Sequence, residues 1–292
     1  MLARSWKLLL SLVLVGALLA FASWEVVLAR KAGRLAEAPK PEGEVPSSEP
    51  QEALTDLGAV LVPEDTPQER ARAYDWRVEG IEPARQQLAY GLGEAVERGL
   101  EEAHRDYSVR LRYRAMGPER FTYVAPPGCG TDMRCIYAEL MRSNAEPVRV
   151  LGERFATSIR ERDLDAAQAT ELILGFVRRI RYELPGDEPF GIVPPGLVPA
   201  QDRGDCDSKA VLALMLLRQV GVDAVMLYSD ALAHAAIGVG LPGTGTRIPF
   251  AGRGYQYAEL TAEGWPLGMI PPQYDKPQLW RVLPLPLPDA PG

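Results

Sequence analysis

The chain has 292 residues, of which 47% are hydrophobic and 24% charged, so it is long enough for one or two domains with a hydrophobic core. These proportions exclude a largely disordered chain, a collagen and a disulfide-rich scaffold. The formal net charge of -7 argues against a nucleic-acid-binding protein, because such a protein needs a broad basic surface.

The N-terminal residues 1–31 have the pattern of an export signal or a membrane anchor. Two basic residues precede an uncharged run over 8–22, which ends in a small-x-small sequence suited to cleavage. Hydrophobic residues resume after Glu25, so residues 8–29 are also long enough to cross a bilayer. Either interpretation places the rest of the chain outside the cytoplasm, as a membrane-anchored, secreted or periplasmic protein.

Two segments are rich in proline. Residues 32–67 mix proline with glutamate, serine and glycine, a composition that buries too little apolar surface to offset the entropy of ordering. We expect a partly extended linker there, with ordered structure beginning near Tyr74. Residues 271–292 are expected to form a loosely packed C-terminal tail, or alternatively a polyproline ligand for a partner.

The next region, residues 68–164, is expected to be a mostly helical N-terminal α/β region. Hydrophobic residues recur at steps of four over 81–105, which predicts a helix. Residues 107–115 alternate between apolar and polar side chains, which predicts a strand with one basic face. Two further helices are expected over 135–142 and 148–160.

Cysteine and histidine are scarce, with three and two residues respectively. His104 falls near the end of the first predicted helix, where we expect it to cap the last carbonyls. Cys129 and Cys135 have no further cysteine or histidine nearby to complete a metal site. In an oxidising compartment these two are expected to form a disulfide, which would contribute about 2 kcal/mol. In the cytoplasm they would remain free thiols.

A third cysteine is placed at the start of a helix. Residues 165–182 predict a helix, and a loop over 184–202 follows that is long enough to be functional. Cys206 then opens another helix, which Gly221 ends. The unpaired N–H groups of a first turn favour a thiolate by only about 0.3–1 kcal/mol, and the two flanking aspartates oppose it. A reactive thiol therefore needs an imidazolium partner.

His234 is the candidate partner. Strands are expected over 222–228, 235–241 and 255–261, with His234 opening the second and Glu259 lying on the third. Adjacent strands can bring a carboxylate to hydrogen-bond range of an imidazole. Glu259 would then hold the ring of His234, as the third member of a catalytic triad does.

These motifs resemble the transglutaminase-like superfamily over about residues 165–270. The resemblance is carried by Val177-Arg178-Arg179-Ile180-Arg181-Tyr182, Gly204-Asp205-Cys206, Gly221-Val222-Asp223-Ala224, His234, Tyr257-Ala258-Glu259-Leu260-Thr261 and Trp265. It implies an α+β fold with a papain-like core, in which the helix carrying the cysteine packs on an antiparallel sheet. It also implies a bacterial-type member that is membrane-anchored or exported. The chain departs from the family at Glu259, where aspartate is usual.

The resemblance further implies a cysteine peptidase, amidase or transamidase that acts through a thioester. Cys206 matches the nucleophile, His234 the general base and acid, and Glu259 the orienting carboxylate. The backbone N–H of Cys206 is the expected oxyanion donor, and Gln201 is a weaker candidate for the second. The expected partner is a protein or peptide substrate, with no cofactor, metal or nucleic acid. The alternative is a non-catalytic binding or scaffold domain tethered to the membrane.

Overall fold

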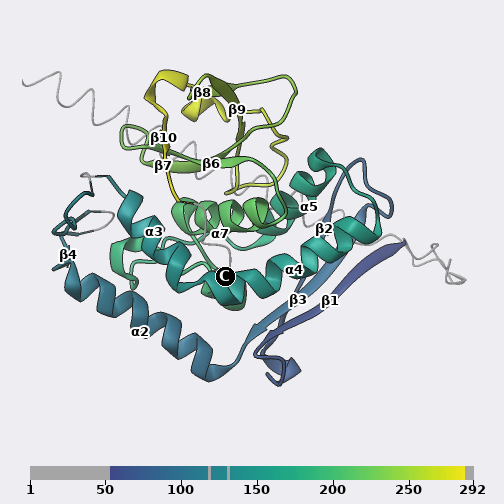
Figure 1. The fold of residues 1–292 in the computed structure, drawn as a ribbon, viewed down its shortest axis with the longest axis horizontal. Helices are drawn as coiled ribbons and strands as arrows, with labels where there is room; N and C mark the ends of the chain where they lie inside the picture. The colour runs from purple at the N-terminus through teal and green to yellow at the C-terminus, as the bar shows by residue number, and fades with distance from the viewer. Residues whose placement is uncertain (1–52, 118–119, 130–131, 287–292) are drawn as a thin grey trace, which may run out of the picture. The chain divides into compact units, whose positions relative to one another are not determined.

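The computed structural model of the chain describes residues 53–117, 120–129 and 132–286, which belong to one compact unit (Figure 1). The predicted signal or anchor over 1–31 lies outside the described residues, as do residues 32–52 of the predicted linker. Within the described ranges, no helix has both the length and the hydrophobicity needed to cross a membrane.

The unit contains a five-stranded antiparallel sheet with strand order β10-β6-β7-β9-β8. Its strands are β6 (Ala224–Ser229), β7 (His234–Val239), β8 (Arg247–Phe250), β9 (Arg253–Ala258) and β10 (Arg281–Leu283). All six residues of β7 are buried, as expected for the central strand of a covered sheet. The chain is thus a mixed helix and strand protein with an antiparallel sheet, as the α+β prediction requires at this coarse level.

A second sheet has the order β1-β3-β2, with β1 (Leu54–Val62) parallel and β2 (Arg72–Arg77) antiparallel to β3 (Arg85–Leu92). The predicted linker is therefore wrong over 53–67, and order begins well before Tyr74. The helix predicted from residue 81 is wrong over β3. Its residues four apart, such as Leu88 and Leu92, lie on one buried face of a strand because four is also a multiple of the strand period.

In the part of the chain that the structure describes, six α-helices surround or connect the sheets. They are α2 (Glu94–Arg110), α3 (Arg134–Ser143), α4 (Ala145–Glu161), α5 (Ala166–Arg179), α6 (Leu197–Gln201) and α7 (Cys206–Gln219). The helices predicted over 135–142, 148–160 and 165–182 are confirmed as α3, α4 and α5. The helix predicted from Cys206 is confirmed as α7, and Gly221 follows its end with φ +82.

The strand predicted over 107–115 is wrong for most of its length, because α2 continues through Arg110. Tyr107 and Leu111 are both buried, whereas Val109 between them is 74% exposed. Burial thus follows a spacing of four rather than two, although the residue types alternate. Only the hairpin β4 (Arg114–Ala115) and β5 (Phe121–Thr122) is extended here.

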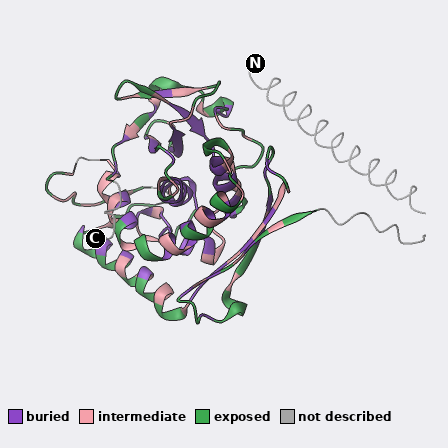
Figure 2. Cartoon of the chain, turned by 45° about the vertical axis from the view of Figure 1, so that its right-hand side comes forward, coloured by how far each residue is buried: buried purple, intermediate pink, exposed green. Residues whose placement is uncertain are grey.

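Helix α7 lies at the centre of the unit and positions the rest. It packs against β6 and β7 on one side and against α3, α4 and α5 on the others (Figure 1). Residues 208–217 are all buried, so the helix has no solvent-facing side over this stretch. Figure 2 shows the same pattern, with buried residues gathered on the innermost elements and exposed residues on the outer helices.

The predicted C-terminal tail is wrong over residues 271–286. These residues form the turns η3 (Pro272–Tyr274) and η4 (Pro277–Leu279) and then β10, which pairs with β6 at the edge of the sheet (Figure 1). The prolines begin short turns, where their missing N–H groups cost nothing. Trp280 is only 5% exposed and packs on Tyr257, so this segment belongs to the core.

This packing predicts that Trp280→Ala lowers the free energy of unfolding by about 3–5 kcal/mol, because a large buried side chain is removed. Urea denaturation followed by circular dichroism measures the change. Met269→Ala is the control, since Met269 is 49% exposed and its loss is expected to cost less than about 0.5 kcal/mol. Equally small effects of the two substitutions would contradict the assignment of residues 271–286 to the core.

Candidate active site

The first turn of α7 is held in place by Asp205, the residue before the helix. Its Oδ1 accepts a hydrogen bond from the Ser208 N–H at 2.9 Å and another from the Ser208 hydroxyl. The same hydroxyl oxygen accepts from the Val193 N–H at 2.9 Å, which ties the preceding loop to the helix. These contacts form a helix N-cap and fix the backbone of Cys206, the first residue of α7.

His234 and Glu259 meet in the buried interior beside this helix start. His234 Nε2 lies 3.2 Å from Glu259 Oε2, and the two side chains are 3% and 1% exposed. His234 is the first residue of β7, and Glu259 directly follows β9, the strand paired with β7. The structure thus brings together the imidazole and the carboxylate that the sequence singled out.

Both carboxylate oxygens of Glu259 accept hydrogen bonds from groups other than His234. Oε2 accepts from the Tyr257 hydroxyl at 2.8 Å, and Oε1 accepts from the Leu260 N–H and from both the N–H and hydroxyl of Thr261. Burial by itself raises the pKa of Glu259, but the His234 imidazole and the Thr261 donors outweigh it and lower the pKa to about 2. The carboxylate is therefore ionised at neutral pH.

Cys206 is 6% exposed, and its Sγ donates to Asp207 Oδ2 at 3.4 Å. A backbone hydrogen bond from Ala235, the residue after His234, places the sulfur beside the start of β7. Among the described residues, no hydrogen bond joins Cys206 to His234. Burial raises the pKa of the thiol, and the neighbouring Asp207 and Asp205 carboxyls raise it further. The sequence predicted that the two flanking aspartates oppose ionisation of the thiol, and this effect is present in the structure.

Aromatic residues from the C-terminal segment cover the imidazole. The Tyr274 ring stacks on His234 with centroids 3.9 Å apart and an angle of 11° between planes. Trp280 meets both rings edge-on, and its Nε1–H donates to the Tyr274 carbonyl at 3.0 Å. Sequence reasoning missed these two residues because it assigned the segment to a tail. Two large aromatic residues in a proline-rich stretch were the available signal.

The backbone of Glu259 is anchored to α5. Arg178 Nε donates to the Glu259 carbonyl at 2.9 Å, and Arg178 Nη1 is paired with Glu171 at 2.9 Å. Lys209 is fully buried in α7, and its Nζ donates to the Ile180 carbonyl at the end of α5 at 2.7 Å. Burial lowers the pKa of Lys209 to about 8. These contacts fix the helix that carries the thiol relative to the loop that carries the carboxylate.

Gln201, the weaker candidate for an oxyanion donor, is the last residue of α6, and its side-chain oxygen accepts from Arg203 Nε at 3.0 Å. This contact leaves the amide N–H groups of Gln201 free to donate, so the role of Gln201 stays a prediction. The second oxyanion donor stays unassigned among the described residues.

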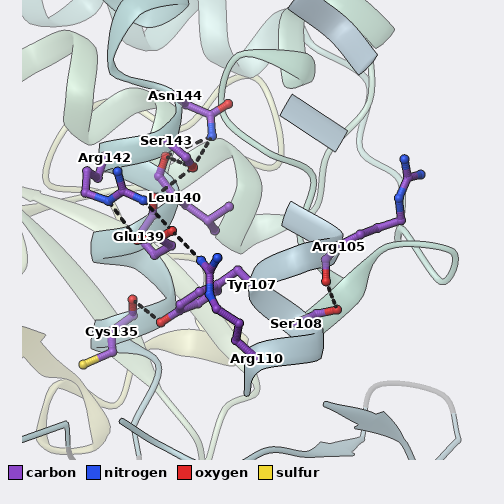
Figure 3. Close-up of polar contacts among 10 residues, drawn as sticks. All are labelled: Arg105, Tyr107, Ser108, Arg110, Cys135, Glu139, Leu140, Arg142, Ser143 and Asn144. Atoms are coloured by element: carbon purple, nitrogen blue, oxygen red, sulfur yellow. Dashed lines mark hydrogen bonds and ion pairs between the residues drawn. The ribbon is translucent and has the colours of Figure 1, made fainter. Parts of the chain in front are cut away.

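The two remaining cysteines and the other histidine have partners of their own. Cys129 and Cys135 are joined by a disulfide, with Cα atoms 6.0 Å apart. Figure 3 shows Tyr107 of α2 donating to the Cys135 carbonyl at the start of α3, at 3.2 Å. His104 lies within α2 rather than at its end, and its Nε2 is 3.0 Å from the Pro189 carbonyl. The predicted capping role of His104 is therefore wrong.

No protein-family model, curated protein or solved structure matches the chain. The resemblance to the transglutaminase-like superfamily therefore stays a prediction from the sequence. What supports an assignment of function is the geometry of Cys206, His234 and Glu259.

The low pKa of Glu259 predicts a pH-dependent loss of stability in Glu259→Gln. Because the folded pKa lies below the ordinary value of 4.5, the ionised carboxylate stabilises the fold above that value. The difference between native protein and variant is expected to be about 3 kcal/mol at pH 7 and to shrink as the pH falls towards 2. Urea unfolding between pH 7 and pH 2 measures it.

The matched control is Glu263→Gln, which removes an exposed ion pair with Arg179. This change is expected to cost less than about 0.5 kcal/mol, because exposed pairs are screened by solvent. A Glu259→Gln difference that stays constant across the pH range would show that the charge of Glu259 does not stabilise the fold.

Proposed function

We propose that this chain is a transglutaminase-like thiol enzyme with a papain-like core, which cleaves or transfers peptide or isopeptide amide bonds through a thioester on Cys206. The observation that carries the proposal is the buried His234–Glu259 contact beside a thiol at a helix start. We also propose that residues 1–31 direct the enzyme to the membrane or out of the cytoplasm, where a protein or peptide substrate would meet it.

The contact between His234 and Glu259 defines which nitrogen serves the thiol. Nε2 faces Glu259, so Nδ1 is the nitrogen available to take the proton from Cys206 Sγ. The ionised Glu259 then balances the imidazolium that forms. This division of the two nitrogens is what a thiol–imidazole–carboxylate triad requires.

Acylation proceeds by proton transfer and attack. His234 takes the thiol proton, the sulfur electron pair forms a bond to the amide carbonyl carbon, and the C–N bond breaks as His234 returns the proton to the leaving amine. The Cys206 N–H, in the first turn of α7, donates to the developing oxyanion. Water or a primary amine then attacks the thioester, with His234 again accepting and returning the proton.

The alternative, a non-catalytic binding or scaffold domain, is favoured by the closure of the site. Cys206 is 6% exposed and hydrogen-bonded to Asp207, and Tyr274 covers the His234 ring. Turnover would require the sulfur to turn towards His234 and the cover to open. A binding domain would require neither movement, so the two functions differ in whether an acyl group ever reaches Cys206.

The test is a pre-steady-state burst with p-nitrophenyl acetate, which reports acyl-enzyme formation. We expect one p-nitrophenolate released per chain in the burst and an acetyl group on the Cys206 peptide by mass spectrometry. Cys206→Ala abolishes both, and His234→Ala slows the burst by about 10²–10⁴-fold. His104→Gln is the matched histidine control and keeps the full burst. No burst and no acetylated Cys206 would support the binding domain.

A second assay separates the two enzymatic outcomes. Casein is incubated with the protein, with and without monodansylcadaverine as the primary amine. New casein fragments indicate hydrolysis, and fluorescent casein indicates transamidation. Either product is expected to disappear in Cys206→Ala, and a product that survives this substitution would come from elsewhere.

A further inference from the structure

The thiol of Cys206 has a hydrogen-bond acceptor other than His234. Its Sγ donates to Asp207 Oδ2 at 3.4 Å, and the other carboxyl oxygen, Oδ1, accepts from the hydroxyl of Tyr137. Tyr137 lies on α3 and is fully buried, so the tyrosine reaches the thiol-bearing helix from a different element. The three side chains form a chain of contacts from α3 to the sulfur.

Asp207 is not needed to cap the helix. Asp205 already accepts the Ser208 N–H in the N-cap position, whereas the side-chain oxygens of Asp207 contact Tyr137 and Cys206. Burial raises the pKa of Asp207, and the donors Tyr137 and Cys206 counteract it. Burial of the Asp207 carboxyl group thus costs free energy, and this group also makes the neighbouring Cys206 thiol harder to ionise.

We propose that Asp207, held by Tyr137, is the resting-state acceptor of the Cys206 thiol and keeps it protonated and turned away from His234 until substrate binds. The role in turnover rests on the proposed function, whereas the effect on the thiol is a property of the chain itself. Tyr137 is a positioning residue in this arrangement, because it reaches the sulfur only through Asp207.

In the resting site the S–H bond of Cys206 is intact and points to Asp207 Oδ2. When the sulfur turns, its proton passes to His234 Nδ1, the electron pair stays on sulfur, and Glu259 balances the imidazolium. No proton passes to Asp207, so its charge disfavours the thiolate as long as the two groups remain in contact.

Other ionisable groups also face the sulfur or Asp207, and the variants must leave them in place. They are Asp205 just before α7, His234 on β7, Tyr228 on β6, Tyr257 on β9 and Tyr274 in η3.

The experiment is the rate of iodoacetamide alkylation of the full-length protein in detergent, measured from pH 5 to pH 10. Cys206 is the one cysteine outside the disulfide, so the rate reports its thiolate fraction. Asp207→Asn removes the negative charge and is expected to lower the thiol pKa by about one unit, which raises the rate about tenfold below both pKa values. An unchanged pKa in a folded Asp207→Asn protein would overturn the proposal.

Tyr137→Phe tests the positioning role, and serves as the second variant if Asp207→Asn does not fold. It is expected to shift the thiol pKa in the native background and to have no effect when combined with Asp207→Asn. Tyr107→Phe is the matched control, because Tyr107 is also a buried tyrosine but its hydroxyl donates to the Cys135 carbonyl and not to Asp207. A Tyr137→Phe shift that is absent, or that is the same in both backgrounds, would contradict the proposal.

The p-nitrophenyl acetate burst distinguishes this proposal from the proposed function. A thiol pKa that falls in Asp207→Asn while the native protein shows no burst would refute the enzyme and leave the Asp207 contact standing. A burst in the native protein together with an unchanged thiol pKa in Asp207→Asn would support the enzyme and refute the role of Asp207.

Discussion

The burial of α7 on all sides is the constraint on which the rest of the structure depends. Its residues from Ser208 to Leu217 are all shielded from solvent, so β6 and β7 must cover one side and α3, α4 and α5 the others. Because the helix cannot turn or slide within this enclosure, the position of Cys206 at its first residue is fixed as well. The same packing brings β7 alongside the helix, and with it His234.

Three buried polar side chains around this apolar centre have hydrogen-bond partners. Glu259 has donors on both oxygens, Asp205 caps the helix, and Lys209 donates to carbonyls at the end of α5. The Cys206 thiol differs from these groups, because its hydrogen-bond partner Asp207 disfavours its ionisation. The site therefore combines a preformed imidazole–carboxylate pair with a buried thiol that is hydrogen-bonded to Asp207.

The sequence predicted those parts whose signal is local. Helices with long apolar periodicity, α3, α4, α5 and α7, were found, and so were the thiol at a helix start and the imidazole at a strand start. The errors arose where a spacing of four fits both helix and strand, as in β3, or where proline suggested a linker or tail, as in β1 and residues 271–286. Tyr137 and Trp280 reach the site through tertiary packing, which no local pattern encodes.

The central claim is that Cys206, His234 and Glu259 form one thiol acyl-transfer centre. A crystal structure of the protein with a bound peptide aldehyde tests this most directly, because an aldehyde traps the tetrahedral geometry of the reaction. The account predicts a bond from Cys206 Sγ to the aldehyde carbon, the adduct oxygen at the Cys206 N–H, and His234 Nδ1 facing the adduct with Nε2 still on Glu259. An unmodified sulfur still on Asp207 at saturating aldehyde would contradict it.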